Sequence, residues 1–252
     1  MFVSADYLSV QYGIDDDIAK FFVDRDPPKD NLYWHEKLLY LRPSPGYLFI
    51  PLMFDLLYRI GISKQQLLGN EFVQTMEKIG HISALEEVKK ITAIEAIGQC
   101  EALVFRTKKN KYWHKCIAAY FKEEPGNLLT NFATPIKALH RGDMFLFALC
   151  NIDIIDEQVQ QIAELWFALI STLLLFDDAE DLQNDLLKGE ENAYIESGLN
   201  PIGLEHINAL VEKNIDKLSK VNRSMAHQLK SSFVQTWKLP YISQLINESK
   251  WH

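Results

Sequence analysis

Apolar residues recur at the spacing of an α-helix through most of this 252-residue chain. Side chains three and four positions apart share one face of a helix, so such a repeat marks a face that packs against a core. The pattern predicts helices over residues 5–23, 31–41, 47–60, 62–79, 84–105, 128–149, 153–188, 203–239 and 242–247. We find no repeat, low-complexity segment or domain linker. The sequence therefore predicts one all-α domain, a bundle of about ten helices.

The helix predicted over residues 153–188 is the longest. Asp153 is placed to cap its start, and Gly189 is placed to end it. About 35 residues at about 1.5 Å each give a length of about 50 Å, enough to thread a whole domain. The apolar stretch within it, Leu165 to Phe176, is twelve residues long. We interpret that stretch as too short to cross a bilayer.

Local patterns predict where one upstream helix begins and what it carries. Ser83 and Glu86 have the spacing of a capping box, so a helix is expected to start at Ala84. On that helix Glu95 lies close to the apolar residues and is the best-placed interior carboxylate before the long helix. The ordinary alternative is that Glu95 is a surface or capping residue.

Two other acidic features have simple explanations. Asp55 and Arg59 are four residues apart on a strongly apolar helix, which favours an ion pair at the helix surface. The triplet Asp15, Asp16 and Asp17 is more typical of an acidic turn near a helix start than of a metal site.

Acidic residues form a stripe at the end of the longest helix. Asp177, Asp181 and Asp185 recur every four residues, with Asp178, Asn184 and Lys188 three residues from them. Like charges at that spacing destabilise an isolated helix by about 0.2–0.5 kcal/mol per pair, so the stripe favours a bound cation. Mg²⁺ is the usual choice because it takes carboxylate oxygens and keeps positions open for phosphate. The alternative is a solvated acidic face.

Composition narrows the classes of partner. The net charge of −8 argues against nucleic acid, because phosphate backbones are bound by basic surfaces. Cys100, Cys116 and Cys150 are odd in number and lack paired-ligand spacing, so they are expected to be free thiols in a reducing compartment. The N-terminus has neither a basic segment nor a sustained apolar core. We therefore expect a cytoplasmic protein without a signal peptide or an integral membrane segment.

At Phe176–Asp181, followed by Asn184–Glu190, the chain resembles the class I isoprenoid synthases. That superfamily holds trans-prenyltransferases, squalene and phytoene synthases and class I terpene cyclases. Its members are all-α bundles in which facing helices carry two acidic clusters that bind a diphosphate through Mg²⁺. The late position of the stripe in this chain matches the second of these clusters.

The stripe is similar to two forms of that cluster. Asp177, Asp178 and Asp181 resemble the prenyltransferase form. Asn184 and Asp185 resemble the terpene-cyclase form, in which Lys188 stands where Ser or Thr is expected.

The resemblance implies a Mg²⁺-dependent enzyme, a prenyltransferase or a terpene cyclase, that ionises a small-molecule isoprenoid diphosphate. It implies five metal ligands: Asp177, Asp178, Asp181, Asn184 and Asp185. Arg141 lies 43 residues before Asn184, about where cyclases place a diphosphate-sensing arginine. Arg141 and Lys188 are the implied diphosphate donors, and Arg141 joins Asp177, Asp178 and Asp181 as an implied catalytic residue. A homodimer is left open.

The first acidic cluster of that family has no clear counterpart here, because residues 47–149 contain no Asp-Asp-x-x-Asp. The available substitutes are Asp55, Glu86, Glu87 and Glu95. A rival hypothesis is therefore a catalytically inactive bundle that binds an apolar ligand or a protein partner. A carboxylate-bridged di-iron bundle is a poor option, because it needs Glu-x-x-His pairs that the sequence lacks.

An ionised allylic substrate also needs a dry pocket with aromatic faces. Candidates, each equally explained as core, are Phe49, Phe54, Phe145, Phe147, Trp166 and Phe167. The basic run from Arg106 to Lys115 either leans over a phosphate group or forms a solvated loop.

Overall fold

The computed structural model describes residues 2–26, 28–32, 40, 42 and 48–249. These residues form helices and no strand, which confirms the predicted all-α fold class. Ten α-helices in the described part of the chain have eight residues or more: α1 (Ala5–Tyr12), α2 (Asp16–Asp24), α4 (Phe49–Arg59), α6 (Asn70–Glu87), α7 (Ala93–Phe105), α8 (Lys111–Phe121), α9 (Asp156–Lys188), α11 (Pro201–Ser219), α12 (Arg223–Thr236) and α13 (Pro240–Ser249). The remaining helices of the described residues are the short α-helices α5 (Lys64–Leu67) and α10 (Ala193–Glu196) and the 3₁₀-helices η3 (Leu129–Asn131), η4 (Lys137–His140) and η5 (Asp143–Asn151).

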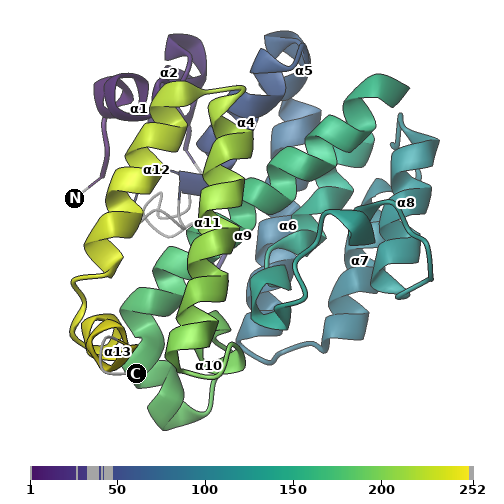
Figure 1. Ribbon diagram of the computed structural model, residues 1–252. Helices are drawn as coiled ribbons and strands as arrows, with labels where there is room; N and C mark the ends of the chain where they lie inside the picture. The colour runs from purple at the N-terminus through teal and green to yellow at the C-terminus, as the bar shows by residue number, and fades with distance from the viewer. Residues whose placement is uncertain (1, 27, 33–39, 41, 43–47, 250–252) are drawn as a thin grey trace.

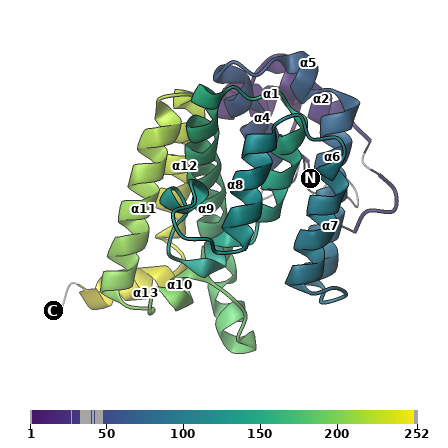
Figure 2. The ribbon, with the colours of Figure 1, turned by 90° about the vertical axis from the view of Figure 1, so that its right-hand side faces the viewer.

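Helix α9 runs through the middle of the bundle (Figure 1, Figure 2). It packs against α4, α11 and α12, whereas α6, α7 and α8 each pack against η5, and α6 and α7 also pack against one another. Helices α1, α2 and α5 lie at one end of the bundle, and α10 lies at the other (Figure 1). The buried apolar side chains form one cluster that reaches from Val3 to Ile242, so the first and last parts of the described chain share a core.

Helix α9 ends as predicted and begins later than predicted. Gly189 follows its last residue with a φ of 69°, a left-handed conformation that glycine adopts without steric cost. At the start, Asp153 is not the cap. Its backbone N–H donates to Gln66 at 2.8 Å, and the side chain of Gln158 accepts from the N–H of Ile155 at 3.1 Å.

Helix α9 is also long and apolar enough to cross a membrane, judged by length and composition. Its most apolar 18-residue window has a mean hydropathy of 1.6, and 78% of that window is buried inside the bundle. A core helix of a soluble protein meets the same criteria, so this property does not distinguish between the two settings.

The predicted N-terminal helix over residues 5–23 is two helices. Gly13 separates α1 from α2 with a φ of 63°, and a side chain there would meet Ser224 at 2.7 Å. Asp15 caps α2 by accepting from the N–H groups of Asp17 and Ile18. The acidic triplet is thus a helix start, as the sequence favoured.

The predicted helix start at Ala84 is wrong. Ser83 is buried in the middle of the last turns of α6, which continues to Glu87. The capping box lies at Thr92 and Glu95 instead, where each side chain accepts from the backbone N–H of the other residue. Both pairs have the same spacing, so only the packing of α6 decided between them.

Two other predicted helices are divided. The segment over 128–149 forms the short η3, η4 and η5 rather than an α-helix. The segment over 203–239 is α11 and α12, separated at Asn222, whose side chain accepts from the N–H of Met225 at 3.0 Å. The predicted helix over 31–41 falls mostly on residues 33–39 and 41, which lie outside the described residues.

Candidate functional site

The acidic stripe lies at the end of the bundle that is away from α1, α2 and α5 (Figure 1). The C-terminal half of α9 carries it, and the turn into α10 folds back against α9. Arg141 joins this region from the connection between η4 and η5. The structure therefore brings Arg141 to the aspartates from 37 residues away in sequence.

Asp178 is the best-anchored residue of the stripe and is 1% exposed. Its Oδ1 accepts a charge-assisted hydrogen bond from Nη2 of Arg141, and its Oδ2 accepts from the backbone N–H of Ala193 at 2.6 Å. Nη1 of Arg141 donates to the carbonyl of Glu191 at 3.2 Å. Burial raises the pKa of Asp178 to about 6, and the positive charge of Arg141 opposes that rise.

Asn192 ties Asp178 to Asp185. Its Nδ2 donates to the carbonyl oxygen of Asp178 at 2.7 Å and to Oδ2 of Asp185 at 2.9 Å. Its Oδ1 accepts from the N–H of Tyr194 at 2.9 Å and so caps α10. The sequence offered one signal for this residue, an asparagine directly before a short helical segment, which is a common N-cap.

Asp177, Asp181 and Asn184 are placed differently. Asp177 is half-buried, and its Oδ2 lies 4.0 Å from Nη2 of Arg141. Asp181 and Asn184 are exposed. Burial raises the pKa of Asp177, Arg141 lowers it, and the negative charges of Asp181 and Asp185 raise it further. The stripe thus divides into a buried part and an open part.

Glu87, the last residue of α6, lies within electrostatic range of the stripe. Its pKa is raised, first by burial and then by the charges of Asp177 and Glu190, with Arg141 acting in the opposite direction. Charges act on one another over several ångströms in a partly buried setting, so this coupling does not require direct contact. A carboxylate from the first half of the chain is therefore electrostatically coupled to Asp177.

The other substitutes for a first acidic cluster serve different purposes. Glu95 is exposed and caps α7, because its Oε2 accepts from the N–H and the hydroxyl of Thr92 at 2.8 and 2.9 Å. Of the two alternatives for Glu95, the surface or capping residue is confirmed and the interior carboxylate is not. Asp55 does pair with Arg59, at 2.6 Å, yet its carboxylate is fully buried rather than at the surface.

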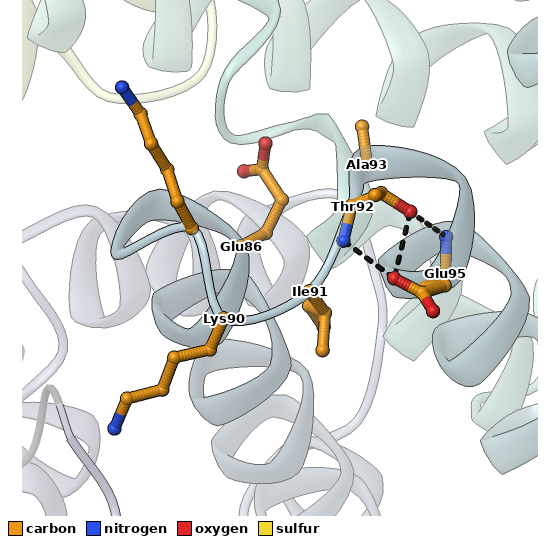
Figure 3. Close-up of a pocket in the computed structure, with 7 residues that line it drawn as sticks. Glu86, Lys90, Ile91, Thr92, Ala93 and Glu95 are labelled. Atoms are coloured by element: carbon orange, nitrogen blue, oxygen red, sulfur yellow. Dashed lines mark hydrogen bonds between the residues drawn. The ribbon is translucent and has the colours of Figure 1, made fainter.

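Glu86 lines a hollow of about 340 Å³ around the turn from α6 to α7 (Figure 3). Lys89, Lys90 and Thr92 contribute to the same hollow, and Lys90 extends away from the Thr92–Glu95 pair (Figure 3). The hollow therefore adjoins Glu87 in sequence and presents side chains of both charges.

The expected diphosphate donors do not all reach the stripe. Lys188 is 55% exposed and lies 4.0 Å from Glu190. The basic run from Arg106 is at the opposite end of α9, because Asn110 donates to the carbonyl of Ile154, just before the helix begins. Asp177 comes more than twenty residues later, about 30 Å along the helix axis. The run is therefore too far from Asp177 to act on the same diphosphate.

Several aromatic candidates are plain core. Phe54 stacks on Phe72 with ring centroids 5.0 Å apart, and Nε1 of Trp166 donates to Asp143 at 3.1 Å. Phe49, Phe145 and Phe167 are also buried, with 6–8% of their surface exposed. The ring centroids of Phe49 and Phe145 are 4.8 Å apart.

The acidic side chains of the stripe meet the needs of Mg²⁺ only in part. Carboxylate oxygens are the ligands that this ion prefers, yet both oxygens of Asp178 are occupied by protein donors. Among the described residues, no three His, Cys, Asp or Glu side chains converge as a ready set of ligands. Asp177, Asp181 and Glu87 are carboxylates of the type that the ion takes, but they do not converge as three ligands here, and the carboxylate of Asp178 is already bound by protein donors.

No protein-family model matches this chain, and neither a curated protein nor a solved structure matches it.

Proposed function

We propose that this protein is a Mg²⁺-dependent enzyme that ionises an allylic isoprenoid diphosphate, as a prenyltransferase or a terpene-synthase-like lyase. One observation carries the proposal beyond the sequence resemblance. The charge of Asp177 on α9 raises the pKa of Glu87 on α6, so two elements distant in sequence bring carboxylates within electrostatic range of one another. A diphosphate site of this kind needs two such walls.

Asp177, Asp181 and Glu87 are the residues that would hold the metal. Burial and like charges raise the pKa values of Asp177 and Glu87. A bound cation would oppose both effects, because its positive charge stabilises the ionised carboxylates. When bound, Mg²⁺ supplies Lewis-acid stabilisation of the diphosphate leaving group.

Arg141 binds and orients the diphosphate in this proposal. Its guanidinium is held by Asp178 and the Glu191 carbonyl and lies 4.0 Å from Asp177, and its side chain as a whole is 35% exposed. Planar guanidinium groups match the geometry of phosphate oxygens. Phe49, Phe145 and Phe167, which are buried with 6–8% of their surface exposed, are the aromatic residues proposed to contact a prenyl chain.

A second hypothesis from another class is an inactive helical bundle that binds an apolar ligand or a protein partner. The lack of three converging ligands among the described residues favours it. The occupied carboxylate of Asp178 favours it as well. The two hypotheses differ in whether diphosphate is released.

The test is incubation with allylic prenyl diphosphates of several chain lengths and Mg²⁺, with release of inorganic diphosphate and products read by mass spectrometry. We expect the natural chain to release diphosphate and the double variant Asp177→Ala/Asp181→Ala to lose this release, because the open part of the stripe then has no aspartate. Glu87→Gln is expected to slow release and raise the Mg²⁺ concentration required.

Glu95→Gln is the matched control, since Glu95 is an exposed carboxylate that serves only as a helix cap. It should release diphosphate at the natural rate. Release that persists unchanged in the double alanine variant would exclude the proposed enzyme, and no release from any substrate by the natural chain would favour the inactive bundle.

A further inference from the structure

Asp177 and Asp178 are adjacent in the stripe, yet Asp177 is half-buried and Asp178 is 1% exposed. Successive residues on an α-helix are rotated by about 100°, so the two aspartates lie on different faces of α9. Residues four apart differ by about 40° and residues seven apart by about 20°. Asp177 therefore shares a face with Asp181, and Asp178 shares a face with Asp185.

The face of Asp178 and Asp185 is closed by α10. Ala193 donates to Oδ2 of Asp178, and Asn192 bridges its carbonyl to Oδ2 of Asp185. Asp178 is 1% exposed and Asp185 is 7% exposed. A metal ion bound on this face would have to displace the N–H of Ala193 and the amide of Asn192 from buried carboxylates.

The connection that carries Arg141 is fixed by contacts of the Arg141 side chain and by contacts of the backbone just before it. Its guanidinium is bound by Asp178 and by the carbonyl of Glu191. The carboxylate of Glu196 on α10 accepts from the N–H groups of Lys137 and Ala138 at 2.8 and 3.0 Å, a few residues before Arg141. Helix α10 therefore holds η4, and Asp178 holds both α10 and Arg141.

We infer that Asp178 is a positioning residue and not a metal ligand: together with Asn192 it locks α10 onto α9 and holds the guanidinium of Arg141 beside Asp177. The role given to Arg141 in this inference rests on the proposed function. The lock itself rests only on the contacts of Asp178, Asn192 and Ala193.

The experiment compares Asp178→Asn with Asp177→Asn, two variants that remove one charge from adjacent positions. Mn²⁺ binding to the protein alone is measured by paramagnetic relaxation of water protons. Asp177→Asn should lose Mn²⁺ binding, whereas Asp178→Asn should keep it within about twofold, because the carboxylate of Asp178 does not reach the metal. Equal loss of Mn²⁺ binding in both variants would overturn the inference.

The affinity for inorganic pyrophosphate in the presence of Mg²⁺, measured by titration calorimetry, tests whether Asp178 positions Arg141. Asp178→Asn and Arg141→Gln should each weaken binding about tenfold, and the double variant should be no weaker than Arg141→Gln, because both act through one guanidinium. Additive losses would contradict this route. Tighter pyrophosphate binding in Asp178→Asn would show that Asp178 competes with the anion for Arg141, which would contradict the positioning role.

If the natural chain binds neither Mn²⁺ nor pyrophosphate, that result counts against the proposed function only. The contact of α10 with α9 through Asp178 and Asn192 is then tested by thermal stability and by proteolysis. Asp178→Asn should lower the melting temperature and speed tryptic cleavage after Lys188, whereas Asp177→Asn should do neither. Asn192→Ala, which leaves every carboxylate in place, should act in the same direction should Asp178→Asn fail to fold. Unchanged melting and cleavage in Asn192→Ala would overturn the lock.

Discussion

Asp143 shows what burial does to a single carboxylate. It is 1% exposed, and its two oxygens accept from the hydroxyl of Tyr120 at 2.6 Å and from Nε1 of Trp166 at 3.1 Å. Burial raises the pKa of Asp143 to about 6, which the two hydrogen bonds and the nearby His140 only partly offset. The carboxylate thus lies in the core with neutral donors as its hydrogen-bonding partners.

This burial predicts a pH dependence of stability. The pKa in the folded chain is above the value in the unfolded chain, so the folded state binds the proton more tightly. Stability from this group is greatest below about pH 4 and is lost as the pH rises toward about 6, by at most about 3 kcal/mol. In Asp143→Asn that part of the pH dependence should vanish.

Urea denaturation between about pH 4 and pH 7 measures the effect, because the linkage relation converts the slope directly into bound protons. Asp178 has a similarly raised pKa, so part of the decline should remain in Asp143→Asn. Asp153→Asn, at an exposed position, serves as control. Identical slopes for the natural chain and Asp143→Asn would contradict the prediction.

At the scale of elements, two glycines within helices predict opposite effects. Gly98 lies inside α7, and a methyl group there would meet nothing within 4 Å. Gly203 lies in the first turn of α11, and a methyl group there would be 2.1 Å from the carbonyl oxygen of Ser197. The close approach of α10 to α11 therefore requires a glycine, and α7 does not.

Gly98→Ala should raise the free energy of unfolding by about 0.5–1 kcal/mol, because alanine loses less backbone entropy in a helix. Gly203→Ala should lower it by about 1–3 kcal/mol, because the backbone of one element must shift. Chemical denaturation of the two single variants gives both values. A stabilising Gly203→Ala would show that α10 does not sit against α11 as described.

At the scale of the whole molecule, Asp55 connects segments that are far apart in sequence. Its carboxylate is fully buried and accepts from the N–H of Asp15 at 2.8 Å, from Nε of Arg59 at 2.6 Å and from Nδ2 of Asn222 at 2.7 Å. Arg59 also donates to the carbonyl of Gly13 at 2.5 Å. One residue of α4 thus joins the turn between α1 and α2 to the start of α12.

Asp55→Asn should lower the free energy of unfolding by about 3 kcal/mol or more, because it leaves Arg59 without its charge partner and turns an amide toward other donors. Asp216→Asn, which removes a largely exposed pair with Lys220, should cost less than about 1 kcal/mol. Urea denaturation compares them. Equal losses would show that Asp55 is not a junction of the fold.

The sequence by itself determined the all-α class, the long helix and its end at Gly189, and the periodic stripe of aspartates. These features are local, because they follow from side-chain spacing on one helix and from the conformational freedom of glycine. The same local rules misplaced the helix start at Ala84. Ser83 with Glu86 and Thr92 with Glu95 have identical spacing, and only packing distinguishes them.

Only the tertiary structure decided which aspartates are open and which are closed. Periodicity grouped Asp177, Asp178 and Asp185 as one set of candidate ligands, and the contacts of Asn192 and Ala193 set Asp178 and Asp185 apart. The electrostatic coupling of Glu87 to Asp177, and the distance of about 30 Å between Asp177 and the basic run, depend on how α6 and α8 pack. Such relations join residues distant in the chain, and no pattern within one helix encodes them.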